Sequence, residues 1–283
     1  MNIKRGLPIG GQALPNGVMM RSREKYTVAL RLRSGRIVTG SWRVEQKRVF
    51  RKPVLRGIYQ LFASFRASFQ TIFRAVQLSK RAGELRIAPL SVISATAAVL
   101  MLTLSVFVSD WIYGYLGESL FRFSEPYLFT LIYGIADLIL LCAALLLITR
   151  LPAVKRLLQY HGAEHKAIAC YEKGLDMTME NVRAQSRFHK RCGTSMMVFV
   201  VLAVFVAAEL IPPQLPETAQ ELILCAVVLI TAGWAYEAMR ARKMTMISRI
   251  GLMAQRITTR EPDDHMIECA IAAVIEAVKS ESS

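Results

Sequence analysis

The chain has 283 residues, 53% of them hydrophobic, and its 36 lysines and arginines against 21 acids give a formal net charge of +15. The apolar residues are gathered in long runs, which excludes a typical soluble globular domain and predicts an integral membrane protein. The five cysteines include no CxxC pair, and we expect no disulfides because these residues would lie in the membrane or in a reducing cytoplasm.

Residues 1–87 form a basic N-terminal region with two predicted elements. From Tyr26 to Val44, apolar and basic side chains alternate around a Ser34-Gly35 turn, a pattern typical of a β-hairpin. From Val54 to Val76 the apolar side chains follow the period of a helix instead. We expect an amphipathic helix there that lies on the membrane or packs on the helical bundle.

Four apolar runs predict four transmembrane helices, two within residues 88–149 and two within residues 196–236. A helix of about 20 apolar residues rises roughly 30 Å, the thickness of the hydrocarbon layer. The last two runs are shorter than the first two. The runs are Ala88–Val108, Tyr127–Thr149, Met196–Leu210 and Leu222–Tyr236. The expected fold is therefore a mainly α, polytopic membrane protein with a small N-terminal β-hairpin and amphipathic cytoplasmic helices.

The distribution of positive charge predicts the orientation. Lysine and arginine number 19 before the first run, one between the first two, nine in residues 150–195, none between the last two and seven after them. This alternation places both termini, the 150–195 loop and the 237–283 tail in the cytoplasm. A further helix is predicted to start at Pro262-Asp263 in the tail. Anionic lipid headgroups account for the basic charge better than nucleic acid does.

A seven-residue segment in the 150–195 loop, YHGAEHK, has the H-x-x-E-H order of inverzincin metallohydrolases. On a helix entered at Pro152 and stopped near Gly174, the imidazoles of His161 and His165 lie one turn apart and can bind one Zn²⁺. Glu164 lies beside them as the candidate catalytic residue. The helical wheel predicts that this polar face is also the buried face. Burial favours a metal over the alternative of histidines held by structural hydrogen bonds.

A third ligand has to come from outside the motif. Glu172 lies about 10 Å beyond His165 along the same helix and is better placed to support a ligand than to bind the metal. The loop before the third span offers Glu180, His189 and Cys192, of which the last two are spaced i, i+3. The sequence leaves the choice between His189 and Cys192 open.

Several short segments, taken together, resemble the YqhQ-like family of uncharacterised bacterial membrane proteins. The resemblance implies a protein of the bacterial cytoplasmic (inner) membrane and a predicted metal-dependent enzyme. The chain has Asn16 where the family usually has Glu, and Ala169 where a third local histidine is often found. The segments are Gly10–Ala13, Gly17–Arg21, Leu55–Gly57, Tyr160–Lys166, Tyr171–Glu172, Asn181–Arg183, His189–Thr194 and Thr258–Asp264.

Two features outside the motif leave alternatives open. Gly10, Gly11 and Gly17 fit either turns with positive φ or a loop that folds back under the motif helix. Asp137 lies inside the second predicted span, where an acid faces a polar partner or an ion path, or else lies in the interfacial third of a tilted helix.

Three classes of function remain. In the first, a cytoplasm-facing hydrolase holds Zn²⁺ or another divalent transition metal with His161, His165 and a third ligand, and Glu164 activates water for attack on a peptide, lipid headgroup or other ester or amide. In the second, four ligands close a structural site in a scaffold or regulator that presents a basic surface to a membrane protein partner or a second copy of the chain. In the third, Asp137 and Glu209 line the path of an oligomeric transporter.

Overall fold

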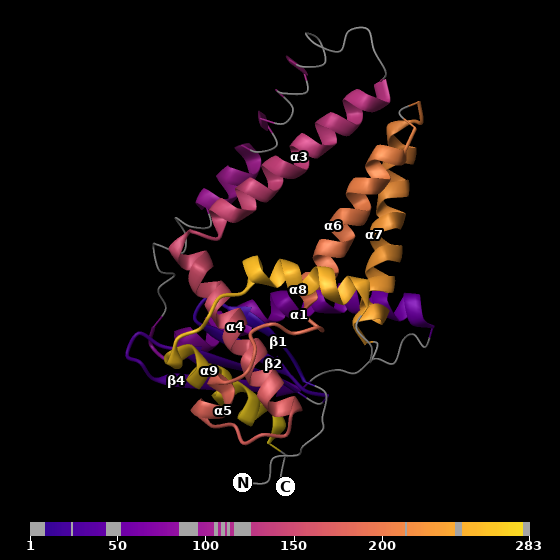
Figure 1. The fold of residues 1–283 in the computed structure, drawn as a ribbon. Coiled ribbons are helices and arrows are strands. Elements are labelled where there is room, and N and C mark those ends of the chain that lie inside the picture. Colours follow the sequence, from indigo (N-terminus) through magenta and orange to yellow (C-terminus); the bar gives the residue numbers. More distant parts are fainter. Residues whose placement is uncertain are drawn as a thin grey trace.

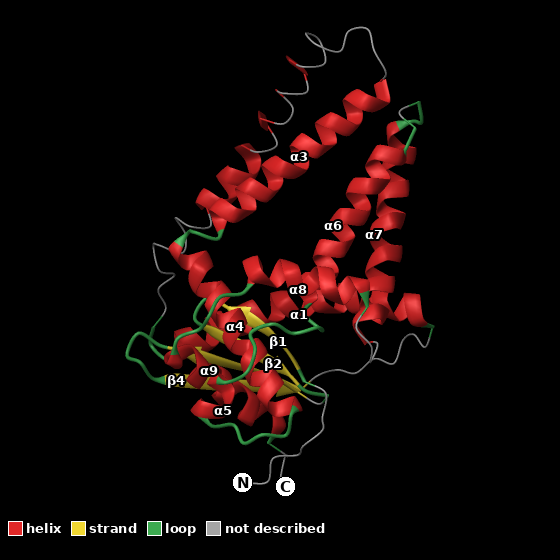
Figure 2. Ribbon diagram, in the orientation of Figure 1, coloured by secondary structure: helices red, strands yellow, loops and turns green. Residues whose placement is uncertain are grey.

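The computed structural model describes residues 9–23, 25–43, 52–84, 96–104, 107–108, 111, 114–115, 126–212, 214–240 and 245–279. These residues are mainly helical and include an N-terminal antiparallel sheet, as Figure 2 shows. The prediction of a mainly α protein with an N-terminal β-hairpin is confirmed at this level.

The sheet has four strands in the order β1-β2-β3-β4, all antiparallel. The predicted hairpin is β3 with β4, and Gly35 adopts a φ of 85° in the turn between them. The two strands before it were not predicted. Their glycines, Gly10, Gly11 and Gly17, lie in strands and not at positive φ, so the interpretation of these residues as turns is wrong. The strands are β1 (Gly10–Leu14), β2 (Gly17–Arg21), β3 (Lys25–Arg31) and β4 (Ile37–Arg43).

Helices cover both faces of this sheet. Successive side chains of a strand point to opposite faces, so β2 sends Val18 and Met20 into one core and Met19 into the other. The first core lies under α4 (Pro152–Glu172) and α9 (Asp264–Val278), and the second lies under α1 (Pro53–Arg81). The inner strands are consequently buried on both sides, as their near-continuous apolar sequence requires.

A second set of helices extends away from the sheet. Figure 1 shows α6 (Gly193–Leu210) and α7 (Glu217–Arg240) standing side by side, with α3 (Pro126–Ile148) inclined to them. At their base, α1 and α8 (Met246–Thr258) run across the pair, between it and the sheet. A short helix, α5 (Met179–Arg183), follows α4.

Length and composition indicate one or two membrane-spanning helices in the part of the chain that is described. The segment Glu217–Met239 of α7 is long and apolar enough to cross a membrane, and a second candidate arises if Gly134–Ile148 and α4, bent by 87°, count as one broken span. The apolar part of α6, Gly193–Ala208, is shorter. Of the predicted first span, 88–108, residues 96–104 and 107–108 are described and are helical, and the others lie outside the described residues.

Close backbone contacts join the crossing helices. A Cβ atom at Gly57 of α1 would lie 2.6 Å from the backbone of Gly233 in α7, so these two glycines allow the helices to touch. Beside them, Arg56 donates two hydrogen bonds to the Glu237 carboxylate, at 3.0 and 2.6 Å. The N-terminal part of α1 is therefore fixed to the sheet-proximal end of α7.

Candidate metal centre

The helix α4 is a rigid platform for the H-x-x-E-H motif. Pro152 occupies its first turn, where the missing N–H group costs no hydrogen bond, and Gly174 follows its end with a φ of 68°. These are the predicted limits. Gly162 admits the backbone of the segment before α9, because a Cβ there would lie 2.1 Å from the carbonyl oxygen of Arg260.

Two faces of α4 are buried, and the more apolar one is not the face that carries the motif. Tyr160, Ala163 and Ala167 pack into the core against α9. The motif face lies about a third of a turn away and lines a cavity, although Glu164 and His165 are only 5% and 2% exposed. The motif face is therefore largely buried, as predicted. The hydrophobic core, however, packs against the neighbouring face of the helix.

Backbone carbonyls fix both motif histidines in one orientation. His161 Nδ1 lies 2.8 Å from the carbonyl oxygen of Thr258, and His165 Nδ1 lies 2.6 Å from that of Arg187. A carbonyl can only accept a hydrogen bond, so each Nδ1 donates its hydrogen and each neutral ring keeps an unprotonated Nε2. Such support of the distal nitrogen is the usual arrangement around metal-binding histidines.

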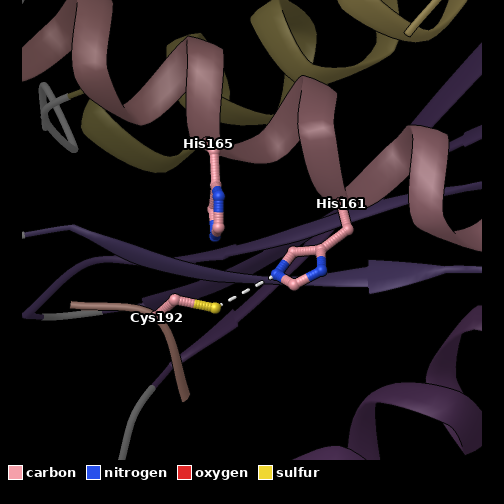
Figure 3. Close-up of side chains that lie close together, drawn as sticks. All are labelled: His161, His165 and Cys192. Atoms are coloured by element: carbon pink, nitrogen blue, oxygen red, sulfur yellow. Dashed lines mark hydrogen bonds between the residues drawn. The ribbon is translucent and has the colours of Figure 1, made fainter. Parts of the chain in front are cut away.

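Cys192 brings a third donor atom to the two imidazoles. Its Sγ lies 3.3 Å from His161 Nε2, the contact drawn in Figure 3, and the ligand atoms of His161, His165 and Cys192 all lie within 4.8 Å of one another. The thiol precedes the first residue of α6 and also contacts the Thr194 hydroxyl at 2.9 Å. Of the two candidate third ligands, Cys192 is the one whose donor atom lies in this cluster.

These three residues fit a zinc ion. Zinc binds imidazole nitrogen at about 2.0–2.1 Å and thiolate sulfur at about 2.3 Å, so a tetrahedral ion separates the two donors by about 3.5 Å. The observed 3.3 Å between His161 Nε2 and Cys192 Sγ is close to that value. The thiol hydrogen now faces an unprotonated nitrogen, and metal binding would release it. Three protein ligands leave one tetrahedral position for water or substrate.

Glu164 lies between the histidines in sequence and against the sheet in space. Burial raises the pKa of its carboxyl to about 7, and the nearby His161 and His189 oppose that rise. A Cβ atom at Gly11 of β1 would lie 2.7 Å from the Glu164 carboxylate oxygen Oε1. The missing side chain at Gly11 therefore leaves room for the Glu164 carboxyl. Of the three N-terminal glycines, Gly11 is the one where a Cβ would meet the motif helix, and it lies in a strand and not in the loop expected there.

His189 contacts an acidic residue and is not part of the three-residue cluster. Its Nε2 lies 3.2 Å from a carboxylate oxygen of Glu172, which also forms an ion pair with Arg191. Burial lowers the pKa of His189, and the charge of Glu164 opposes that effect. Glu172 thus contacts two residues of the loop that carries Cys192. This contact is compatible with the supporting role expected for Glu172. Glu180, the other acid of this loop, is exposed on α5 and is not among the three clustered donors.

The residues that position the loop were not identified from sequence. Gln255 of α8 is fully buried and closes a pair of hydrogen bonds with the backbone of His189, each 2.8 Å long. Its amide also reaches Ser195 Oγ at 3.2 Å, and Gly251 packs directly against the same serine. A helical pattern with the N-cap Thr245 was the available signal for α8. The backbone carbonyls of Thr258 and Arg187 could not be identified from the sequence, because every residue has one.

Asp137, the acid of the second predicted span, lies on α3 and is partly buried. It is not among the residues that line the cavity beside the metal centre. The described structure therefore assigns the histidines, Cys192 and Glu164 to one site and leaves Asp137 outside it.

Comparison with known proteins identifies relatives along almost the full length. Residues 52–280 match a family described as "Protein of unknown function (DUF1385)". A protein of Bacillus subtilis (strain 168) described as "Uncharacterized protein YqhQ" is 29% identical over 305 residues, covering 96% of the chain and 93% of the relative. The comparison with solved structures found no match. The YqhQ-like resemblance is confirmed.

Proposed function

The chain belongs to this YqhQ-like DUF1385 family, and from its own geometry we propose that it is a zinc-dependent hydrolase of the cytoplasmic membrane. One observation carries the proposal: two imidazoles with fixed tautomers and one thiol converge beside a buried carboxyl on the wall of a cavity. Three donors with an open position are typical of catalytic zinc sites, whereas structural sites have four. The pairing of His189 with Glu172 therefore favours the hydrolase over the closed-site scaffold.

Each residue has a defined task in this proposal. His161, His165 and Cys192 hold the ion, which would act as a Lewis acid toward water and the scissile group. Glu164 accepts a proton from the attacking water and returns it to the leaving oxygen or nitrogen. One water is consumed, the acyl or phosphoryl bond breaks, and an acid and an alcohol or amine are released.

The membrane topology is part of the proposal. Four spans with cytoplasmic termini would place the sheet, α4 and α9 on the cytoplasmic side, as the distribution of basic residues predicts. Support comes from the exposed apolar side chains of α7, such as Leu222 at 71% and Ile230 at 53% exposure. Lipid would cover these side chains, or a membrane protein partner or second copy of the chain would do so.

The test is the zinc content of the detergent-purified full chain, prepared without added metal and without a histidine tag. We expect about one zinc per chain in the wild type and in His189→Ala, and none in His161→Ala/His165→Ala. Cys192→Ser should also lose the metal, because a hydroxyl is a much poorer zinc ligand than a thiolate. The His189→Ala variant is the matched control, since it removes an imidazole at 5.8 Å from the His165 ring.

Equal, negligible metal in all four proteins would refute the proposal and leave the histidines as structural groups. Loss of zinc from His189→Ala with retention in Cys192→Ser would contradict the ligand assignment.

A further inference from the structure

The cavity beside the metal centre is larger than a site for a small metabolite. Its volume is about 1790 Å³, whereas small-molecule sites commonly measure roughly 300–1,000 Å³. His161, Glu164 and Cys192 line one part of it, and α1 contributes Phe62 and Phe73 to another. A ligand that fills this space would extend from the metal centre to α1.

The charge on the cavity wall is strongly positive. The described residues that line it include a single carboxylate, Glu164, and six arginines. Arg191 is paired with Glu172 outside the cavity lining, and the other five are Arg21, Arg23, Arg43, Arg66 and Arg74. Two of the arginines lie over aromatic rings of the same wall: Arg21 is 5.3 Å from the Tyr26 ring and Arg74 is 5.6 Å from the Trp42 ring. Guanidinium groups in this number select a phosphate-bearing ligand.

The cavity continues into an exposed apolar stripe on α1. Phe62 and Phe73 line the cavity and are 60% and 64% exposed. Phe65 and Phe69 lie on the same helix face and are 51% and 74% exposed. A phosphate group in the cavity and a hydrocarbon chain on this stripe would therefore belong to one amphiphilic molecule.

The position of α1 indicates where that molecule comes from. Figure 1 shows α1 crossing the base of the α6–α7 pair, and the contacts of Arg56 and Gly57 fix it to the end of α7. Since α7 contains the helix long enough to cross a membrane, α1 lies at the level of the membrane surface. In the proposed topology, the part of the cavity that α1 lines would then lie near the headgroups of the cytoplasmic leaflet.

Building on the proposed hydrolase, we propose that its substrate is an anionic phospholipid of the cytoplasmic leaflet. The phosphate-bearing headgroup occupies the arginine-lined cavity against Glu164 and the metal centre. The acyl chains rest on the phenylalanine stripe of α1. A soluble phosphate ester shares the headgroup chemistry but has no part that needs the stripe.

The test measures lipid contact at Trp42, which lies on the cavity wall. Trp111 and Trp234, both exposed, are replaced by phenylalanine so that Trp42 is the sole tryptophan. The full chain is reconstituted in phosphatidylcholine vesicles in which a fixed fraction of the lipid is brominated phosphatidylglycerol or brominated phosphatidylcholine. We expect stronger quenching of Trp42 by the anionic lipid.

Two matched double variants assign the preference. Arg66→Gln/Arg74→Gln removes two exposed arginines of α1 that line the cavity, and Arg249→Gln/Arg256→Gln removes two exposed arginines of α8 that do not. The first should lower the preference for phosphatidylglycerol by about fivefold per arginine, and the second should leave it unchanged. Each quenching ratio is normalised to the variant's own unquenched fluorescence.

The proposal is overturned if both lipids quench equally in the wild-type background, if the α8 variant loses the preference as strongly as the α1 variant, or if glycerol phosphate abolishes the quenching. The readout requires neither metal nor turnover. Loss of the lipid preference with zinc retained therefore counts against the substrate class alone, and absence of zinc with the preference retained counts against the hydrolase alone.

Discussion

Apolar side chains are buried in one region of the described chain and exposed in another. In the sheet with α4 and α9, side chains such as Ile267 and Val274 are at most 1% exposed and pack against other parts of the protein. On α7, apolar side chains of similar size, Leu222 and Ile230, point outward. Covering one such side chain is worth about 1.5–3 kcal/mol, so lipid or a protein partner that covered the second region would stabilise it. The difference separates a closed-core module, made of β1–β4, α4 and α9, from an outward-facing apolar layer, made of α3, α6 and α7.

The first prediction concerns where the chemistry resides. Glu164→Gln should reduce turnover by about 10²–10⁴-fold while zinc content is unchanged, because the amide cannot accept the proton of water. Asp137→Asn in the outward-facing apolar layer should leave turnover unchanged. Turnover is measured on the best substrate from a screen of phospholipid esters and peptides. A greater loss in Asp137→Asn would move the function toward transport.

The second prediction concerns stability. Ile267→Ala should lower the free energy of unfolding by about 2–5 kcal/mol, because a cavity remains in a closed core. Leu222→Ala, which truncates an apolar side chain at 71% exposure, should change it by less than about 0.5 kcal/mol in detergent. Pulse proteolysis in a denaturant series compares the two. Similar losses would mean that α7 packs against protein on its outward face.

The third prediction separates catalysis from folding within the closed-core module. Gly11→Ala would push the Glu164 carboxyl aside, since the new Cβ would lie 2.7 Å from it, and the flexible side chain can move without unfolding the strand. We expect about a 10²-fold loss of turnover with an unchanged melting temperature. Gly10→Ala has nothing within 4 Å of its new Cβ and is the matched control. Equal activity of the two variants would exclude the β1 contact as a determinant of Glu164 position.

The fourth and smallest effect is expected at the joint between the two regions. Gln255→Leu preserves volume but leaves the His189 backbone without its two hydrogen bonds, so the Cys192 loop is held less firmly. Zinc affinity should fall by about 10–100-fold in competition with a chelator. Gln220→Leu, which removes a 2.8 Å hydrogen bond to Leu215 at the start of α7, should not change it. An unaltered affinity in both would show that the loop is fixed by Glu172 alone.

Periodicity was sufficient to predict the elements whose apolar side chains recur on one face. The β3–β4 hairpin, α1, α4 and α9 form within a few residues of the expected limits. The strands β1 and β2 are five residues long and rich in glycine, so their pattern was too short to distinguish from turns. Only pairing with β3 makes them strands.

The helix α8 escaped prediction for a different physical reason. Its buried face carries Ser248, Gly251 and Gln255, whereas Met246 and Met253 are exposed at 77% and 68%. Uncharged polar side chains face the protein, while these two methionines face outward beside charged residues such as Arg249 and Arg256, which departs from the pattern expected of a helix in water. In the candidate site, the motif predicted that His161 and His165 lie close together, but the proximity of Cys192 and not His189 depends on a loop path that spacing alone does not fix.

Because backbone carbonyl groups orient the two histidines, this arrangement tolerates side-chain substitutions at the residues that supply them. Every residue has a carbonyl, so replacing the side chain of Thr258 or Arg187 leaves the acceptor in place. The orientation of the two imidazoles therefore depends on the path of the main chain and not on the side chains at these two positions. A scan of side-chain substitutions would register it only indirectly, wherever a change diverts the backbone path near residues 187 and 258.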